Sequence, residues 1–124
     1  MIRYVLIFLG GGIGAVARYG LQGFVHRYAG NNFPYGTLVV NLLGCFVLGY
    51  LMVAFEERFL MNPALRLFLT IGILGGFTTF SSFSFETVAL LRDGEWMFGM
   101  SNILASVIGC LLATFAGMAA AKAI

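Results

Sequence analysis

The stretch GGFTTFSSFSFE at residues 75–86 combines two glycines, four phenylalanines, five hydroxyl side chains and one carboxylate inside a long apolar run. Two adjacent glycines followed closely by two adjacent threonines form a helix poorly, so the stretch predicts a break in a helix. After the break, a helix that advances ~100° per residue places Phe80, Phe83 and Thr87 on one face. The neighbouring polar stripe consists of Thr79, Ser82 and Glu86.

These side chains share a chemistry that suits an anion. The edge of an aromatic ring and the hydrogen of a hydroxyl group both carry partial positive charge. A surface of such donors, with no lysine in it, can dehydrate a small, strongly hydrated anion without trapping it. The alternative is a polar contact between helices, which accounts for the serines but not for paired rings beside a break. Backbone carbonyls freed at such a break often coordinate a cation.

Two polar side chains in other apolar stretches have two interpretations each. Asn41, in GTLVVNLLGCFVLGY, either joins two helices through its amide or donates a hydrogen bond to an anion in a pore. Arg18 lies deep in the first apolar stretch. Its side chain either extends to the membrane interface or makes a vestibule electropositive.

Glu86 is the only acid in the interior of an apolar stretch, where a proton-coupled transporter would use it. It lies six residues before Arg92, so we expect it to reach water. His26 is the sole histidine and has no cluster of ligands around it in the sequence. Since no metal-ligating set and no nucleophile–base arrangement can be assembled, the sequence does not predict an enzyme.

The elements that position these residues follow from composition. Of the 124 residues, 60 % are hydrophobic and only 10 % are charged, against roughly 25 % charged in a soluble domain. Each long uncharged stretch exceeds the ~20 residues that a helix needs to cross a bilayer. The sequence therefore predicts an all-α integral membrane protein, one domain over residues 1–124 with four transmembrane helices. The predicted spans are about 4–25, 34–55, 67–91 and 96–121.

Small residues recur at four-residue spacing within three of these spans, which predicts helices that approach one another closely and favours an oligomer. The three sets are Gly10 and Gly14, then Gly72 and Gly76, then Gly109, Ala113 and Gly117. Both cysteines, Cys45 and Cys110, fall inside spans and behave there as small apolar residues.

The basic residues give only a weak preference for cytoplasmic termini, so insertion in both orientations is compatible with the sequence. On the side of the termini lie Arg3, Arg58, Arg66 and Lys122, and on the other side lie Arg27 and Arg92.

The motifs GGGIGAVARYG, GTLVVNLLG with Asn41, and GGFTTFSSFSFE together resemble the Fluc (CrcB) fluoride channels of microbes, in the same order and over essentially the whole chain. The resemblance implies a multi-pass protein of the cell membrane that lowers cytoplasmic fluoride by passive efflux. It also implies an antiparallel, dual-topology homodimer with two fluoride pores, whose third helix is broken in the middle of the membrane.

The resemblance assigns roles to particular residues. It implies that Phe80, Phe83 and Asn41 line the fluoride path, and that the backbone carbonyls of Gly75 and Thr78 from both subunits hold a structural Na⁺. The hydroxyl groups beside the rings are then those of Ser81, Ser84 and Thr114, with Asn102 and Ser106 as a further polar face.

Two other functions remain open at this point. A small dual-topology multidrug transporter coupled to protons would use Glu86, although its substrate site would require a deeper carboxylate than this chain offers. An accessory membrane subunit would conduct nothing by itself.

Overall fold

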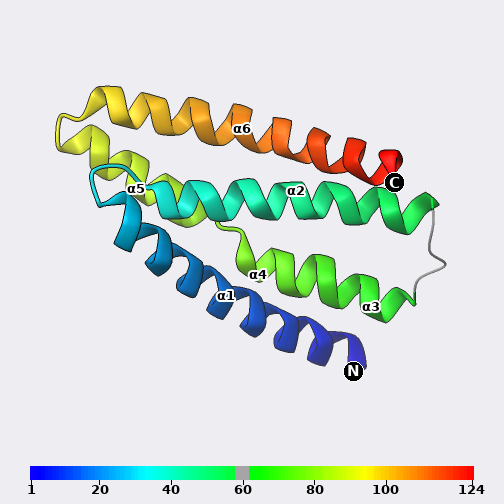
Figure 1. Ribbon diagram of the computed structural model, residues 1–124. Helices are drawn as coiled ribbons and strands as arrows, with labels where there is room; N and C mark the ends of the chain where they lie inside the picture. Colours follow the sequence, from blue (N-terminus) through cyan, green and yellow to red (C-terminus); the bar gives the residue numbers. More distant parts are fainter. Residues whose placement is uncertain (58–61) are drawn as a thin grey trace.

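The computed structural model describes residues 1–57 and 62–124, so Arg58, one of the basic residues considered above, lies outside the described residues. The described part contains only helices and the turns between them. In chain order the elements are α1 (Ile2–Ala29), α2 (Tyr35–Glu57), α3 (Pro63–Leu67), the π-helical segment η1 (Phe68–Leu74), α4 (Gly75–Phe77), α5 (Phe80–Arg92) and α6 (Trp96–Ala123). Figure 1 shows long helices side by side, with both termini at the same end.

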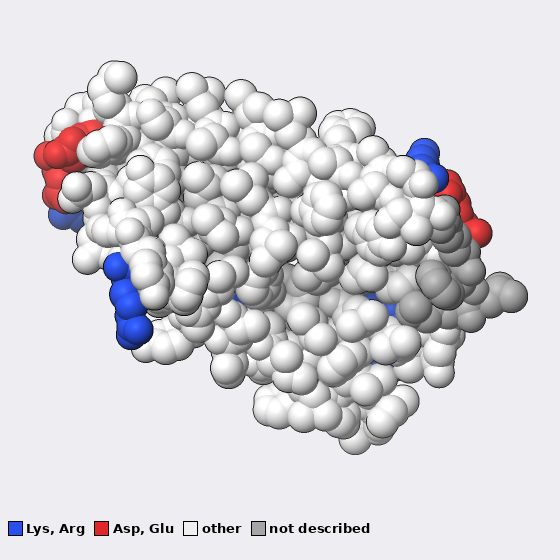
Figure 2. Space-filling view, viewed as in Figure 1, with Lys and Arg blue, Asp and Glu red and all other residues white. Residues whose placement is uncertain are grey.

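Four helical stretches are long and apolar enough to cross a membrane: Ile2–Ala29, Tyr35–Glu57, Pro63–Arg92 and Trp96–Ala123. Large apolar side chains such as Phe8, Val16 and Phe115 are exposed on their outer faces. Figure 2 shows charged side chains mostly at the two ends, with an uncharged face between them. An uncharged, apolar surface of this kind belongs in lipid. The chain is a multi-pass membrane protein, as the sequence predicts.

The third span is broken near its middle. Thr78 (φ −78°, ψ 153°) and Thr79 (φ −149°, ψ 117°) are extended, between α4 and α5. Gly75 is helical instead (φ −63°, ψ −37°). The predicted break therefore exists but lies at the threonines. It ends where the Thr79 hydroxyl accepts a hydrogen bond from the Ser82 backbone N–H, as an N-cap that starts α5.

The small residues of α1 pack against the first half of this span, as expected. A side-chain carbon added to Gly10 would lie 2.8 Å from the Phe68 carbonyl oxygen and 2.9 Å from the Cα of Gly72. A carbon added to Gly14 would collide with the carbonyl oxygen of Ile73. The two backbones are in direct contact, which only glycine permits at these positions.

The helix α2 packs against α6 in a similar way. A side-chain carbon at Gly49 would collide with the Thr114 carbonyl oxygen, and one at Gly117 with the Phe46 carbonyl oxygen. The break in the third span therefore lies beside a closely packed pair of long helices, and its residues face that pair.

The turns also follow from the sequence. Asn62 caps α3 by accepting the Ala64 backbone N–H at 2.9 Å, and Pro63 is the first residue of that helix. Gly94, with φ 79°, forms the turn between α5 and α6, where other residues would be strained.

Candidate functional site

A pocket of about 370 Å³ lies where α2 and α6 pass the break in the third span. We call it the break pocket. Its lining combines rings, hydroxyl groups, an amide and two thiols. The lining residues are Asn41, Cys45, Thr78, Thr79, Phe80, Phe83, Ser106, Val107, Cys110, Leu111 and Thr114.

The rings of Phe80 and Phe83 form a pair in this pocket, with centroids 5.3 Å apart and planes inclined at 52°. Phe83 is buried, whereas Phe80 is 77 % exposed. Tilted rings present their edges, which carry partial positive charge, rather than two parallel faces. Phe85, on the same helix, is also exposed but is not part of the break pocket.

Asn41 binds the break directly. Its side-chain Nδ2 donates to the Thr79 carbonyl oxygen at 3.0 Å, and its Oδ1 accepts the Thr79 backbone N–H at 2.8 Å. The amide therefore joins α2 to the third span, the first of its two interpretations. One amide hydrogen takes part in this contact, and the side chain also lines the break pocket.

The same contact affects the carbonyl of Gly75. In a continuous helix the Thr79 N–H would donate to the Gly75 carbonyl four residues earlier. Here that N–H donates to the Asn41 side chain instead. In the same way, the Ser82 N–H would donate to the Thr78 carbonyl in a continuous helix, but here it donates to the Thr79 hydroxyl. Within the described residues, the carbonyls of Gly75 and Thr78 receive no hydrogen bond across the break.

Of the three hydroxyl groups that the resemblance places beside the rings, only one lines the break pocket. Thr114 lines the break pocket, but its hydroxyl donates to the Cys110 carbonyl oxygen of its own helix at 3.0 Å. Ser81 and Ser84 are exposed on α5 and do not line the pocket. The Ser81 hydroxyl lies 3.2 Å from that of Thr79.

A buried chain of hydrogen bonds supports the backbone of Phe83. The Thr87 hydroxyl donates to the Phe83 carbonyl at 2.7 Å and accepts from the Asn102 amide at 2.9 Å. The Ser106 hydroxyl completes the chain by donating to the Asn102 side-chain oxygen at 3.2 Å. Asn102 and Ser106 thus tie α6 to α5 behind the ring.

A second polar cluster lies nearer one end of the molecule. The Thr37 hydroxyl donates to Glu86 Oε1 at 2.7 Å and accepts from the Gln22 amide at 3.0 Å. Glu86 Oε2 and His26 Nδ1 are buried without a hydrogen-bond partner in the described part of the chain. Both residues line a pocket of about 210 Å³.

This cluster adds detail to two expectations. Glu86 is half-buried and bonded to Thr37, and it lines one pocket with His26, although the described residues contain no group of three ligands that could hold a metal ion. Gln22 and Thr37 were missed from the sequence. Thr37 lies one helical turn before Asn41 on the same helix, and that spacing was the available signal.

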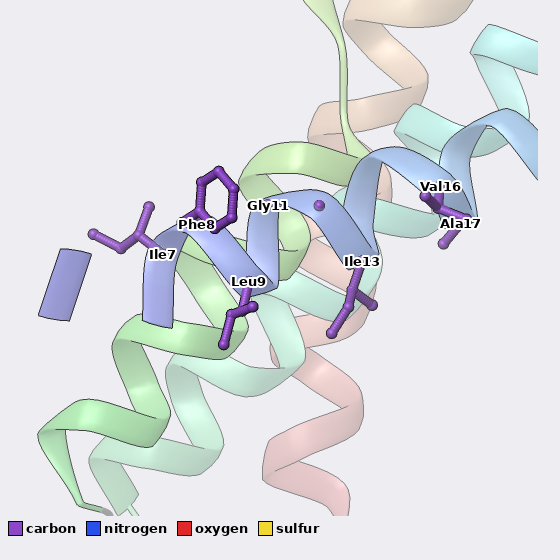
Figure 3. Close-up of a pocket in the computed structure, with 8 residues that line it drawn as sticks. Ile7, Phe8, Leu9, Gly11, Ile13, Val16 and Ala17 are labelled. Carbon is purple, nitrogen blue, oxygen red and sulfur yellow. The ribbon is translucent and has the colours of Figure 1, made fainter. Parts of the chain in front are cut away.

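Arg18 is half-buried on α1 and lines neither polar pocket. Another hollow, of about 850 Å³, follows α1, and its lining residues are apolar. Figure 3 shows its side chains, among them Phe8, Ile13 and Val16, along that helix. With no polar group, this hollow suits a lipid tail or another apolar helix rather than an ion.

In the described ranges, no group of three or more His, Cys, Asp or Glu side chains could hold a metal ion. The arrangement at the break pocket therefore offers ring edges, hydroxyls, amides and main-chain carbonyls rather than a charged binding site.

Comparison with known proteins matches residues 5–118 to the family described as "CrcB-like protein, Camphor Resistance (CrcB)". A "Fluoride-specific ion channel FluC" of Geobacter sulfurreducens is 52 % identical over 122 residues, covering 98 % of both chains. Proteins with the same name are similar in Citrifermentans bemidjiense (47 % over 124 residues, all of both chains) and in Dehalococcoides mccartyi (50 % over 117 residues, 94 % of this chain and 90 % of the relative).

Proposed function

The chain belongs to the CrcB family, whose similar members are named as fluoride-specific ion channels and not as enzymes, and on this basis we propose that it conducts fluoride. The observation that carries the proposal is the break pocket, where the edges of Phe80 and Phe83 lie beside hydroxyl and amide groups and no lysine or arginine lines the wall.

The pocket suits fluoride for a physical reason. A small, strongly hydrated anion must lose water to enter a narrow site, so the site must supply many weak donors in place of that water. A fixed ammonium group would bind the ion tightly and slow its release. Ring edges, each worth on the order of 1 kcal/mol by analogy with other quadrupole contacts, stabilise the ion without holding it.

We propose that fluoride leaves the cytoplasm passively across the cell membrane. Hydrogen fluoride crosses membranes as a neutral weak acid and ionises inside, where the anion is retained. An inside-negative potential contributes ~2.3 kcal/mol per 100 mV toward moving one negative charge out. A channel therefore suffices, and the carboxylate of Glu86 is not required to couple transport to protons.

The functional unit in this proposal is an antiparallel homodimer with two pores. Two features of the single chain support it. Phe80 of the break pocket and the neighbouring Gly75 are exposed, although both are far from the charged ends of the third span. The apolar hollow along α1 gives a second surface on which another apolar helix can pack.

A structural Na⁺ at the centre of that dimer is part of the proposal. The carbonyls of Gly75 and Thr78 fit such an ion, because the hydrogen bonds that would occupy them in a continuous helix go to Asn41 and Thr79. Carbonyl oxygens are hard ligands, which Na⁺ prefers. When bound, the ion would hold the two breaks together by charge, while Asn41 keeps Thr79 in its extended conformation.

Flux from liposomes that contain only this protein tests the proposal. The liposomes are loaded with potassium fluoride, valinomycin carries the balancing potassium, and a fluoride electrode records efflux. We expect rapid efflux without any proton gradient. An absence of flux would indicate an accessory subunit, and transport of organic cations that stops in Glu86→Gln would indicate a multidrug transporter.

A further inference from the structure

The break pocket contains a pair of thiols that fluoride conduction does not use. Cys45 comes from α2 and Cys110 from α6, both are half-buried, and both line the pocket. They are the only two cysteines of the chain. Both side chains therefore open into the same pocket.

Helix packing holds the two thiols together. Gly49 and Thr114 follow Cys45 and Cys110 by four residues each, about one helical turn, so each lies on the same face as its cysteine. At that level the backbones touch, since a side-chain carbon on Gly49 would collide with the Thr114 carbonyl oxygen. The two cysteines therefore lie at one level of the α2–α6 contact and line one pocket, on helices that cannot separate without losing this contact.

We propose that Cys45 and Cys110 form a two-coordinate binding site for a soft divalent metal ion, with Hg²⁺ as the fitting ion, and that its occupation obstructs the break pocket. Binding replaces two S–H bonds by two sulfur–metal bonds and releases two protons to water. No oxidation or reduction takes place.

Charge and ligand number both select the ion. Two thiolates cancel the charge of a divalent ion, so the bound complex is neutral, as an apolar pocket requires. Thiolate sulfur prefers soft metals. No group of three or more His, Cys, Asp or Glu ligands exists in the described ranges, so the site cannot give Zn²⁺ the four ligands that it usually takes.

The position of the site connects it to the proposed fluoride path. Asn41, one turn before Cys45, and Thr114, one turn after Cys110, line the same pocket as Phe83. A metal ion and its two sulfur ligands would occupy space beside the ring pair. This effect on flux rests on the proposed function, whereas binding by the two thiols does not.

Binding is measured first, without reference to flux. Purified, reduced protein is titrated with HgCl₂ while the ultraviolet absorption of the sulfur–mercury bonds is recorded. We expect one Hg²⁺ per chain, two protons released per ion, and no comparable band with Zn²⁺. Because chelation strengthens binding by about 100-fold or more, a competing monothiol should remove Hg²⁺ from Cys45→Ser and from Cys110→Ser at about 100-fold lower concentration than from the unaltered protein.

Flux is measured next in liposomes, with each variant compared with its own rate before metal is added. In HgCl₂ the unaltered protein should lose most of its fluoride efflux and recover it when a dithiol is added. The double variant, which carries both Cys45→Ser and Cys110→Ser, should keep its own rate in HgCl₂.

If either single variant retains Hg²⁺ as tightly as the unaltered protein, the two thiols do not act as a pair and the proposal is wrong. If Hg²⁺ binds to the pair but efflux continues unchanged, the part that concerns obstruction is wrong. A protein that chelates Hg²⁺ as expected but never conducts fluoride contradicts the proposed function and leaves the binding site supported.

Discussion

Phe80 and Phe83 form one ring pair but meet different surroundings in a single chain. Phe83 is buried and its backbone is fixed by the hydrogen-bond chain through Thr87, whereas Phe80 is 77 % exposed. A ring edge acts on an ion only where water is excluded, since water otherwise screens the contact. We therefore expect the buried ring to make the stronger contact with an ion within one chain, and the exposed ring to make one only when a second surface covers it.

Replacing Phe83 by isoleucine tests the role of the ring edge. The change keeps much of the apolar bulk but removes the partly positive edge hydrogens. Loss of ~1.4 kcal/mol at a dehydrated constriction lowers a rate about tenfold, so we expect Phe83→Ile to reduce fluoride efflux about tenfold or more and Phe80→Ile to be impaired. Phe85→Ile is the matched control, because Phe85 is about as exposed as Phe80 but does not line the break pocket. Normal conduction by both pocket variants together with loss in Phe85→Ile would mean that another face of α5 lines the path.

Asn41 offers a separate test, because its amide makes two hydrogen bonds to Thr79. Asn41→Leu keeps the size but leaves the Thr79 N–H and carbonyl without these partners. Unsatisfied buried groups cost ~1–3 kcal/mol each, so we expect a clearly lower unfolding temperature in detergent together with reduced efflux. If efflux falls while the unfolding temperature is unchanged, Asn41 acts on the ion rather than on the break.

At the scale of the elements, the sequence predicts the four apolar helices and the existence of a break, because composition and helix propensity are local properties. It places the break among the glycines and threonines of residues 75–79 but does not predict which of them leave the helix. The glycines remain helical, and Thr79 is drawn out of the helix by Asn41, which is 38 residues away. The cluster of Gln22, Thr37 and Glu86 escaped prediction for the same reason, since three helices must pack before it exists.

The close approach of α1 to the third span can be tested with one methyl group. A Cβ at Gly14 would collide with the Ile73 carbonyl, whereas a Cβ at Gly20 has no neighbouring atom within 4 Å. Overpacking typically costs ~1–3 kcal/mol, and alanine is otherwise the better helix former by ~1 kcal/mol. We expect Gly14→Ala to lower the unfolding temperature and Gly20→Ala to leave it unchanged or higher. Equal unfolding temperatures would show that α1 is not held against backbone.

At the scale of the whole molecule, the charges lie mostly at the two ends and the apolar faces lie between them (Figure 2). Arg3, Arg66 and Lys122 belong to the end that carries the termini, and Arg27 and Arg92 to the opposite end. The two ends differ little in their number of basic residues, so these residues give little preference for one orientation in the membrane.

We therefore expect both orientations in the cell membrane and a dimer after purification. Single cysteines introduced near either end of a variant without Cys45 and Cys110 should be labelled from outside the cell in part of the population. Cross-linking and mass measurement in lipid should give two chains per particle. Active protein that is entirely monomeric, or inserted in only one orientation, would contradict the antiparallel dimer.

Sodium should act on assembly and not on transport, because its proposed ligands are main-chain carbonyls that cannot titrate through a cycle. Fluoride efflux should be the same with Na⁺ inside, outside or on both sides. Prolonged dialysis against a Na⁺-free buffer should slow efflux and lower the unfolding temperature, and added Na⁺ should restore both. An efflux rate that follows the direction of a Na⁺ gradient would instead indicate coupled transport.

The most direct test of the proposed function is the reversal potential of the current that purified protein carries across a planar bilayer. With fluoride concentrated on one side, chloride on the other, and cations equal, we predict a current that reverses close to the equilibrium potential of fluoride. That potential should not move when chloride is varied or when a pH gradient is imposed. A reversal potential that follows chloride or pH, or the absence of any current from protein shown to be folded, would contradict a fluoride-selective passive pore.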